Sequence, residues 1–114
     1  MNPYIAYLDN TIERLKCEEQ ELIVSERKDE ANFIKIKMNI CDICKTIYNV
    51  VLKSSSDTDR KKRYIGQMTR LEENWQVSLV KAKEHEDVEK IVIEEIKLEM
   101  LRMILGKYEE LEGE

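Results

Sequence analysis

The chain has 114 residues, which is enough for a single domain. Charged residues make up 38% of it and aromatic residues only 6%, and it holds three glycines and one proline. This composition is typical of long helices and excludes most sheet architectures. The net charge of −5 disfavours non-specific binding to nucleic acid or to an anionic membrane.

The N-terminal residues and the cysteines indicate a cellular compartment. Residues 1–4 show no basic start that leads into an apolar stretch, so we expect no signal peptide. No window approaches the roughly 18 apolar residues that a membrane-spanning helix needs. The three cysteines fit no disulfide framework. We therefore expect a protein of the reducing cytoplasm, without a membrane partner.

The first predicted element is a helix over residues 3–53. Asn2 can cap it, and Pro3 suits the first helical position, where its missing N–H costs nothing. Apolar residues recur in it at a strict seven-residue period, at eleven of fourteen positions, which predicts a narrow coiled-coil seam. The two series of seam positions are Ile5, Ile12, Glu19, Glu26, Phe33, Ile40 and Ile47, and Leu8, Leu15, Leu22, Asp29, Ile36, Ile43 and Val50.

A serine-rich turn is predicted at residues 54–58, followed by a second helix over residues 59–105. Asp57 or Thr58 would cap this helix, and Gly106 would end it as a left-handed cap. Residues 106–114 would then form a frayed tail. A short turn makes consecutive helices antiparallel neighbours, so the sequence predicts an all-α hairpin of two long helices with coiled-coil-like packing.

The polar positions of the seam leave two architectures open. In an antiparallel hairpin, Glu26 and Asp29 lie opposite residues 83–89, the most polar stretch of the second helix. Either both long helices continue through one shared polar layer, or both break near Glu26 and His85 and the four pieces fold into a compact bundle. We favour the continuous helices, because residues 25–30 contain good helix formers and neither glycine nor proline.

The end of the second helix carries more apolar surface than one partner helix can bury. Beyond Val88, apolar residues cover more than half of the helix circumference. A two-helix hairpin is also too thin to form a core of its own. We therefore expect two hairpins to dimerise into a four-helix bundle. The candidate partner-binding residues are Ile93, Leu98, Leu101, Ile104 and Leu105.

The cysteines give little support for catalysis. Cys41 and Cys44 form a C-x-x-C motif, but redox versions place the first cysteine at a helix N-terminus, and this one lies deep inside the predicted helix. Cys17 falls on the outer face, so we expect an exposed free thiol. The chain has no glycine-rich phosphate loop, and no nucleophile has a nearby histidine and acid. We predict no catalytic residue and no cofactor.

A metal site is one alternative. Its ligands would come from Glu26, His85, Glu86 and Glu89, near the polar layer. The Glu-x-x-His motif of di-iron bundles fails, because Ala82 stands three residues before the histidine. A solvated polar layer therefore remains the favoured interpretation, and we predict no metal ligand.

A nucleic-acid site is the other alternative. Its basis is the basic run Arg60–Arg63, which lies in the first turn of the second helix, where cations oppose the helix dipole. Nucleic-acid binding normally needs a broader basic face or interleaved aromatic residues. The favoured function is therefore a non-enzymatic, self-associating protein-protein interaction module, an adaptor or a small chaperone-like protein.

Overall fold

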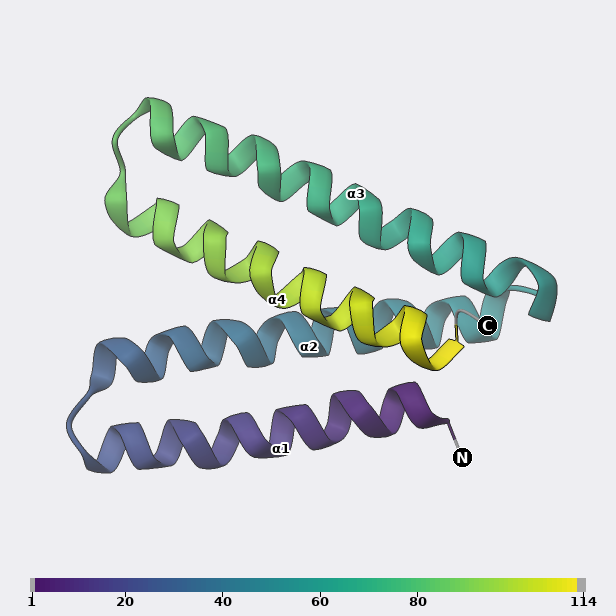
Figure 1. Cartoon of the computed structure of the whole chain (residues 1–114), viewed down its shortest axis with the longest axis horizontal. Helices are drawn as coiled ribbons and strands as arrows, with labels where there is room; N and C mark the ends of the chain where they lie inside the picture. The colour runs from purple at the N-terminus through teal and green to yellow at the C-terminus, as the bar shows by residue number, and fades with distance from the viewer. Residues whose placement is uncertain (1, 113–114) are drawn as a thin grey trace.

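The computed structural model describes residues 2–112, and these residues form four helices and no strand. The helices are α1 (Pro3–Val24), α2 (Lys28–Ser54), α3 (Asp57–Glu84) and α4 (Val88–Glu112). Helices α1 and α2 form one antiparallel hairpin, and α3 and α4 form a second (Figure 1). The two hairpins meet at the end that holds both chain termini and diverge toward their turns.

The continuous helices predicted over residues 3–53 and 59–105 are therefore each divided in two, at the places where the sequence left a break open. At the first break Glu26 adopts the left-handed conformation (φ 62°). The amide of Arg27 donates to the Leu22 carbonyl at 2.8 Å, and the amide of Glu26 donates to the Ile23 carbonyl at 3.0 Å. This pair of bonds is a Schellman motif, which satisfies the last carbonyls of α1 without a glycine.

The second break repeats the same geometry. Glu86 has a φ of 54°, the amide of Asp87 donates to the Ala82 carbonyl at 3.0 Å, and the amide of Glu86 donates to the Lys83 carbonyl at 3.2 Å. A folded-back chain covers the apolar side of each helix with other helices of the same chain. Burial of that surface outweighs the left-handed penalty, which is about 1–2 kcal/mol for each residue.

The predicted helix ends are partly confirmed. The Asn2 side chain accepts hydrogen bonds from the amides of Tyr4 and Ile5, and Pro3 is the first helical residue, as expected. The central turn is shorter than predicted, because α2 ends at Ser54 and α3 begins at Asp57. The cap residue of α3 is Ser56, where the sequence predicted Asp57 or Thr58.

The predicted frayed tail is wrong over the described residues. Helix α4 continues through Gly106, which has no positive φ, as far as Glu112. The buried Tyr108 anchors these last turns, and the Tyr48 hydroxyl donates to the Glu112 carboxylate at 2.7 Å. Residues 113–114 of the predicted tail lie outside the described residues.

The two hairpins repeat each other at an offset of 60 residues, as between Tyr4 and Tyr64. The left-handed residues Glu26 and Glu86 obey the same offset, so α1 corresponds to α3 and α2 to α4. The buried residues also correspond. The matching core pairs are Tyr4 and Tyr64, Leu8 and Met68, Ile40 and Met100, Cys41 and Leu101, Cys44 and Ile104, and Tyr48 and Tyr108.

Four buried tyrosines, one from each helix, join the hairpins at the closed end: Tyr4, Tyr48, Tyr64 and Tyr108. Their ring centroids lie 4.8–6.1 Å apart, mostly edge to face. This arrangement is favourable for aromatic pairs by about 0.5–1.5 kcal/mol each. The hydroxyls of Tyr4 and Tyr64 lie 2.6 Å apart. The tyrosine cluster thus joins the hairpins at one end of the molecule, while the hairpins diverge toward the other end, which we call the open end (Figure 1).

Candidate partner-binding site

The space between the first halves of α2 and α4 narrows from the open end of the molecule to its middle. Both helices run from the open end toward the closed end (Figure 1). Farther along, Ile40 of α2 is fully buried and Met100 of α4 is 3% exposed. Nearer the open end, Phe33 and Ile93 are only half-buried. The apolar faces of α2 and α4 therefore cover each other in the middle of the two helices but not in their first turns.

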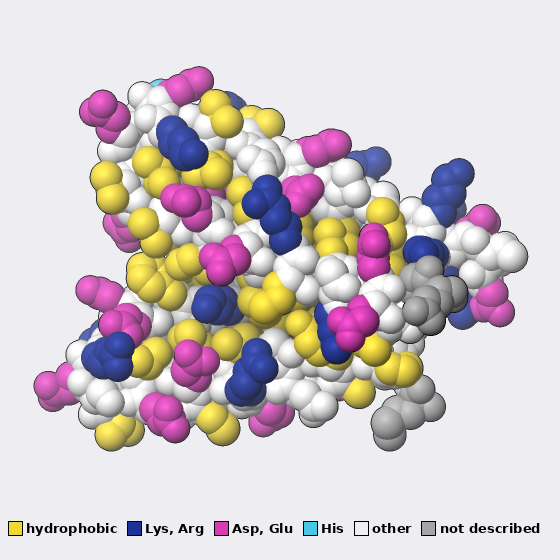
Figure 2. All heavy atoms as spheres, viewed as in Figure 1, with side chains coloured by type: hydrophobic (Ala, Val, Ile, Leu, Met, Phe, Trp, Pro, Cys, Tyr) yellow, Lys and Arg dark blue, Asp and Glu magenta, His cyan; other side chains and the backbone are white. Residues whose placement is uncertain are grey.

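A pocket of about 520 Å³ occupies this space, which we call the wedge. Hydrophobic side chains gather between the two hairpins on the face that Figure 2 shows. Both hairpins contribute to the lining at corresponding positions, since Asp29 matches Glu89 and Phe33 matches Ile93 at the 60-residue offset. The residues that line the wedge are Asp29, Asn32, Phe33, Ile36, Glu89 and Ile93.

The charges of the wedge are all negative. Asp29 and Glu89 are exposed, lie in the first turns of α2 and α4, and enter none of the ion pairs among residues 2–112. Helix N-termini favour carboxylates by about 0.3–1 kcal/mol, so both acids are also compatible with the fold. No lysine or arginine lines the wedge. The wedge can therefore accept an apolar group that has a positive charge beside it.

The predicted partner-binding residues are mostly core residues of the chain itself. Leu98, Leu101 and Ile104 are at most 3% exposed, and Leu105 packs against the core. Other helices of the same chain cover these α4 side chains, so they are not available to a partner, whereas Val92 and Met103 of α4 remain 36% and 49% exposed. Only Ile93 lies in the wedge. Sequence reasoning missed Asp29, Phe33 and Ile36 as wedge residues.

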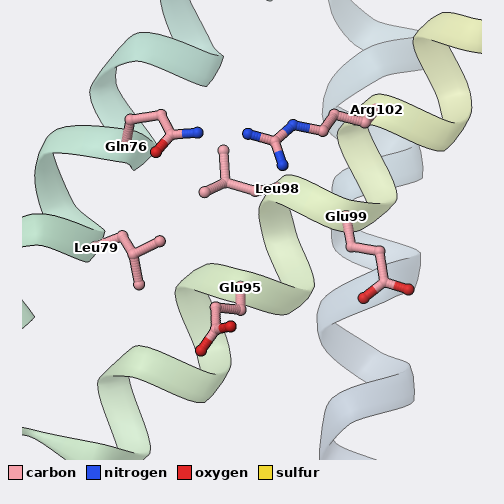
Figure 3. A pocket seen from close by; sticks show the side chains of 6 residues that line it. All are labelled: Gln76, Leu79, Glu95, Leu98, Glu99 and Arg102. Atoms are coloured by element: carbon pink, nitrogen blue, oxygen red, sulfur yellow. The ribbon is translucent and has the colours of Figure 1, made fainter. Parts of the chain in front are cut away.

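A second pocket lies between α3 and α4 and offers little apolar surface. Its floor is Leu79 and Leu98, which are 9% and 3% exposed. Figure 3 shows that the Gln76 amide and the Arg102 guanidinium point toward each other across it. Arg102 also donates to Glu72 at 3.2 Å, so its charge is already paired. This pocket lacks the accessible apolar walls of the wedge.

The predicted polar layer is only partly assembled. Glu26 and His85 lie in the turns of different hairpins, which are far apart at the open end (Figure 1). Asp29 and Glu89, in contrast, line the same wedge. Within residues 2–112, no three His, Cys, Asp or Glu side chains lie close enough together to hold a metal ion.

The basic run has a structural explanation at two of its positions. Arg60 pairs with Asp57 and donates to the Leu52 carbonyl at 3.2 Å, while Arg63 donates to the Ser55 hydroxyl at 3.2 Å. These contacts hold the short connection between α2 and α3. The guanidinium groups at the helix start thus compensate for the unfavourable dipole by satisfying polar groups of the turn.

The C-x-x-C motif is buried. Cys41 and Cys44 are both 0% exposed, and burial raises the pKa of Cys41 to about 11 and of Cys44 to about 12. A thiol with a raised pKa is a poor nucleophile and a poor metal ligand. Cys17 is an exposed free cysteine, which confirms the sequence prediction.

No helix among the described residues is long and apolar enough to cross a membrane. Comparison of the chain with protein-family models, with curated proteins and with solved structures finds no match.

Proposed function

We propose that this chain is a non-enzymatic interaction module that binds a basic amphipathic helix of a protein partner in the wedge. The half-buried apolar walls of the wedge, set beside two unpaired carboxylates, carry this proposal. A partner helix would place an apolar side chain against Phe33 and Ile93, and lysine or arginine side chains beside Asp29 and Glu89.

The energetics of the wedge fit a helical partner. Full burial of one large apolar side chain contributes about 1.5–3 kcal/mol, and the walls that would bury it are already formed by α2 and α4. Helix-in-groove recognition relies on such apolar anchors. The carboxylates add charge complementarity, which mainly selects the partner and speeds its association.

The lining of the wedge supports binding over catalysis. It supplies apolar side chains, one amide and two carboxylates, with no histidine, cysteine, serine or lysine. Such a set lacks a nucleophile that a neighbouring base could activate. We also propose a cytoplasmic location, because free cysteines, two of them buried, are typical of proteins in a reducing compartment.

The test is the binding of a fluorescent amphipathic helical peptide built from leucine and lysine, followed by anisotropy. The variant Asp29→Lys with Glu89→Lys should raise the Kd about tenfold or more, because it replaces attraction by repulsion at the wedge. The matched control is Glu95→Lys with Glu99→Lys, which makes the same charge change at the pocket of Figure 3.

The control variant should bind the peptide as the unmodified chain does. Equal loss of affinity in both variants would show that only net charge matters, and would overturn the proposal. Absence of binding to the unmodified chain would overturn it as well.

A further inference from the structure

The turn between α1 and α2 is a short connection held in a conformation that its residues disfavour. The turn residues Ser25, Glu26 and Arg27 include no glycine, yet Glu26 has a φ of 62°. Only glycine, and to a lesser extent asparagine, adopts this region readily. Glutamate and arginine are instead good helix formers. The local preference of this turn therefore favours one straight helix over the bend.

The corresponding turn between α3 and α4 is better fixed. Asp87 accepts a hydrogen bond from the Lys90 amide at 3.1 Å, which caps the start of α4. Arg27 stands at the start of α2 without any side-chain cap bond. The second turn also contains histidine and aspartate and is followed by Val88, all weaker helix formers than Glu26 and Arg27 of the first turn. The first turn is thus the one more easily straightened.

The sequence around the first turn is already arranged for a continuous helix. The seven-residue seam keeps one register from Ile5 in α1 to Val50 in α2, with no residue inserted or deleted at the bend. A helix that continued through the turn would present both halves of the seam on one side. Straightening would remove α1 from α2 and leave the surface it covers open.

The surface that α1 would vacate is complementary to the α1 sequence in shape, hydrogen bonding and charge. Tyr4 and Leu8 are fully buried in it, and the Tyr4 hydroxyl bonds that of Tyr64. Asp9 on α1 also pairs with Lys45 on α2 at 2.5 Å. The α1 helix of a second copy offers these same groups in the same order.

We propose that two copies of this chain exchange α1 by straightening the turn at Glu26, which gives a dimer with one continuous helix over residues 3–54 in each copy. The dimer re-forms the packing of α1 on α2 between the two copies and removes the left-handed conformation of Glu26 in each copy. Strained short hinges favour such exchange. This inference concerns self-association and does not depend on what binds in the wedge.

The dimer Kd tests the hinge directly and is measured by light scattering after refolding at high chain concentration. Glu26→Gly stabilises the bent turn and destabilises the straight helix. Each effect shifts the equilibrium between the straight and the bent form of one hinge by about fivefold toward the bent form. A dimer contains two hinges, so Glu26→Gly should raise the dimer Kd by about 600-fold. Glu86→Gly is the matched control and should leave the Kd unchanged, because the second turn stays bent in both states.

Two further variants of the first turn act in opposite directions. Replacing Ser25, Glu26 and Arg27 together by alanine should lower the dimer Kd, because alanine favours the straight helix. Lys28→Pro should abolish the dimer, because proline is tolerated at the first position of α2 but breaks a continuous helix. A triple-alanine variant that remains monomeric at every concentration would overturn the proposal.

The Asp9–Lys45 pair distinguishes exchange from face-to-face association. A carbodiimide joins a carboxylate to a neighbouring amine without a spacer, so it should link these two side chains. In a refolded mixture of ¹⁴N-labelled and ¹⁵N-labelled chains, exchanged dimers that contain one chain of each label should yield linked peptides that carry one label on each side. Linked peptides with a single label throughout the dimer fraction would overturn the proposal.

Discussion

The substitution Tyr64→Phe should destabilise the protein more than Tyr4→Phe, although both remove one hydroxyl from the same hydrogen bond. The Tyr64 hydroxyl donates its hydrogen to the Cys44 carbonyl at 3.3 Å. With that hydrogen directed at Cys44, the Tyr64 hydroxyl accepts from Tyr4, whose hydroxyl lies 2.6 Å away. Both side chains are fully buried, so water cannot replace a lost partner.

The magnitudes follow from which group is left without a partner. Tyr64→Phe leaves the buried Tyr4 hydroxyl with no acceptor, which costs about 1–3 kcal/mol, and also removes the bond to the Cys44 carbonyl. Tyr4→Phe removes one bond and leaves the Tyr64 donor satisfied, at a cost of about 0.5–1.5 kcal/mol. The double variant orphans no donor, so its cost should be smaller than the sum of the two single costs.

Urea unfolding followed by the fluorescence of Trp75, the one tryptophan, measures all three free energies of unfolding. In thermal unfolding, the larger cost should appear as a melting temperature that is lower by several degrees for Tyr64→Phe than for Tyr4→Phe. Equal costs for the two single variants, or a double variant equal to their sum, would refute the assigned direction of the hydrogen bonds.

Three further outcomes are expected. Glu86→Gly should raise the free energy of unfolding by about 1 kcal/mol in urea titrations, since glycine adopts the observed φ of 54° without strain; an unchanged midpoint would contradict this. A thiol reagent near pH 8 should modify Cys17 rapidly and Cys41 and Cys44 only after unfolding, so rapid modification of all three would contradict their burial. Burial raises the pKa of Tyr108 to about 12, so the unfolded chain loses that proton first, near its ordinary value of about 10. The contribution of protonated Tyr108 to the free energy of unfolding is thus present below pH 10 and should be lost as the pH rises to about 12. A free energy of unfolding that stays constant across that range would contradict this prediction.

The helical class and several helix ends could be predicted from local sequence because their causes are local. Asn2 caps α1 and Pro3 starts it, as their side chains dictate. The seam also marks buried residues correctly at Leu8, Leu15 and Ile40. Each of these predictions depends only on residues within a few turns of one helix.

The two breaks and the wedge could not be predicted in this way. Glu26 and Glu86 have no local preference for the left-handed region, so the bends exist only because folding back buries apolar surface elsewhere. The wedge depends on how far two packed helices diverge, which no single helix encodes. The repeated tyrosines 60 residues apart were the available signal, because they pair Asp29 with Glu89 and Phe33 with Ile93 across the two hairpins.

The most direct test of the proposed function is an NMR titration of the ¹⁵N-labelled chain with the leucine and lysine peptide. Chemical-shift changes should concentrate at the wedge, at the amides of Asp29, Phe33, Glu89 and Ile93 and their neighbours. The corresponding leucine and glutamate peptide should leave these amides unchanged. Shift changes centred on the pocket between α3 and α4, or equal responses to both peptides, would show that the wedge does not bind a basic helix.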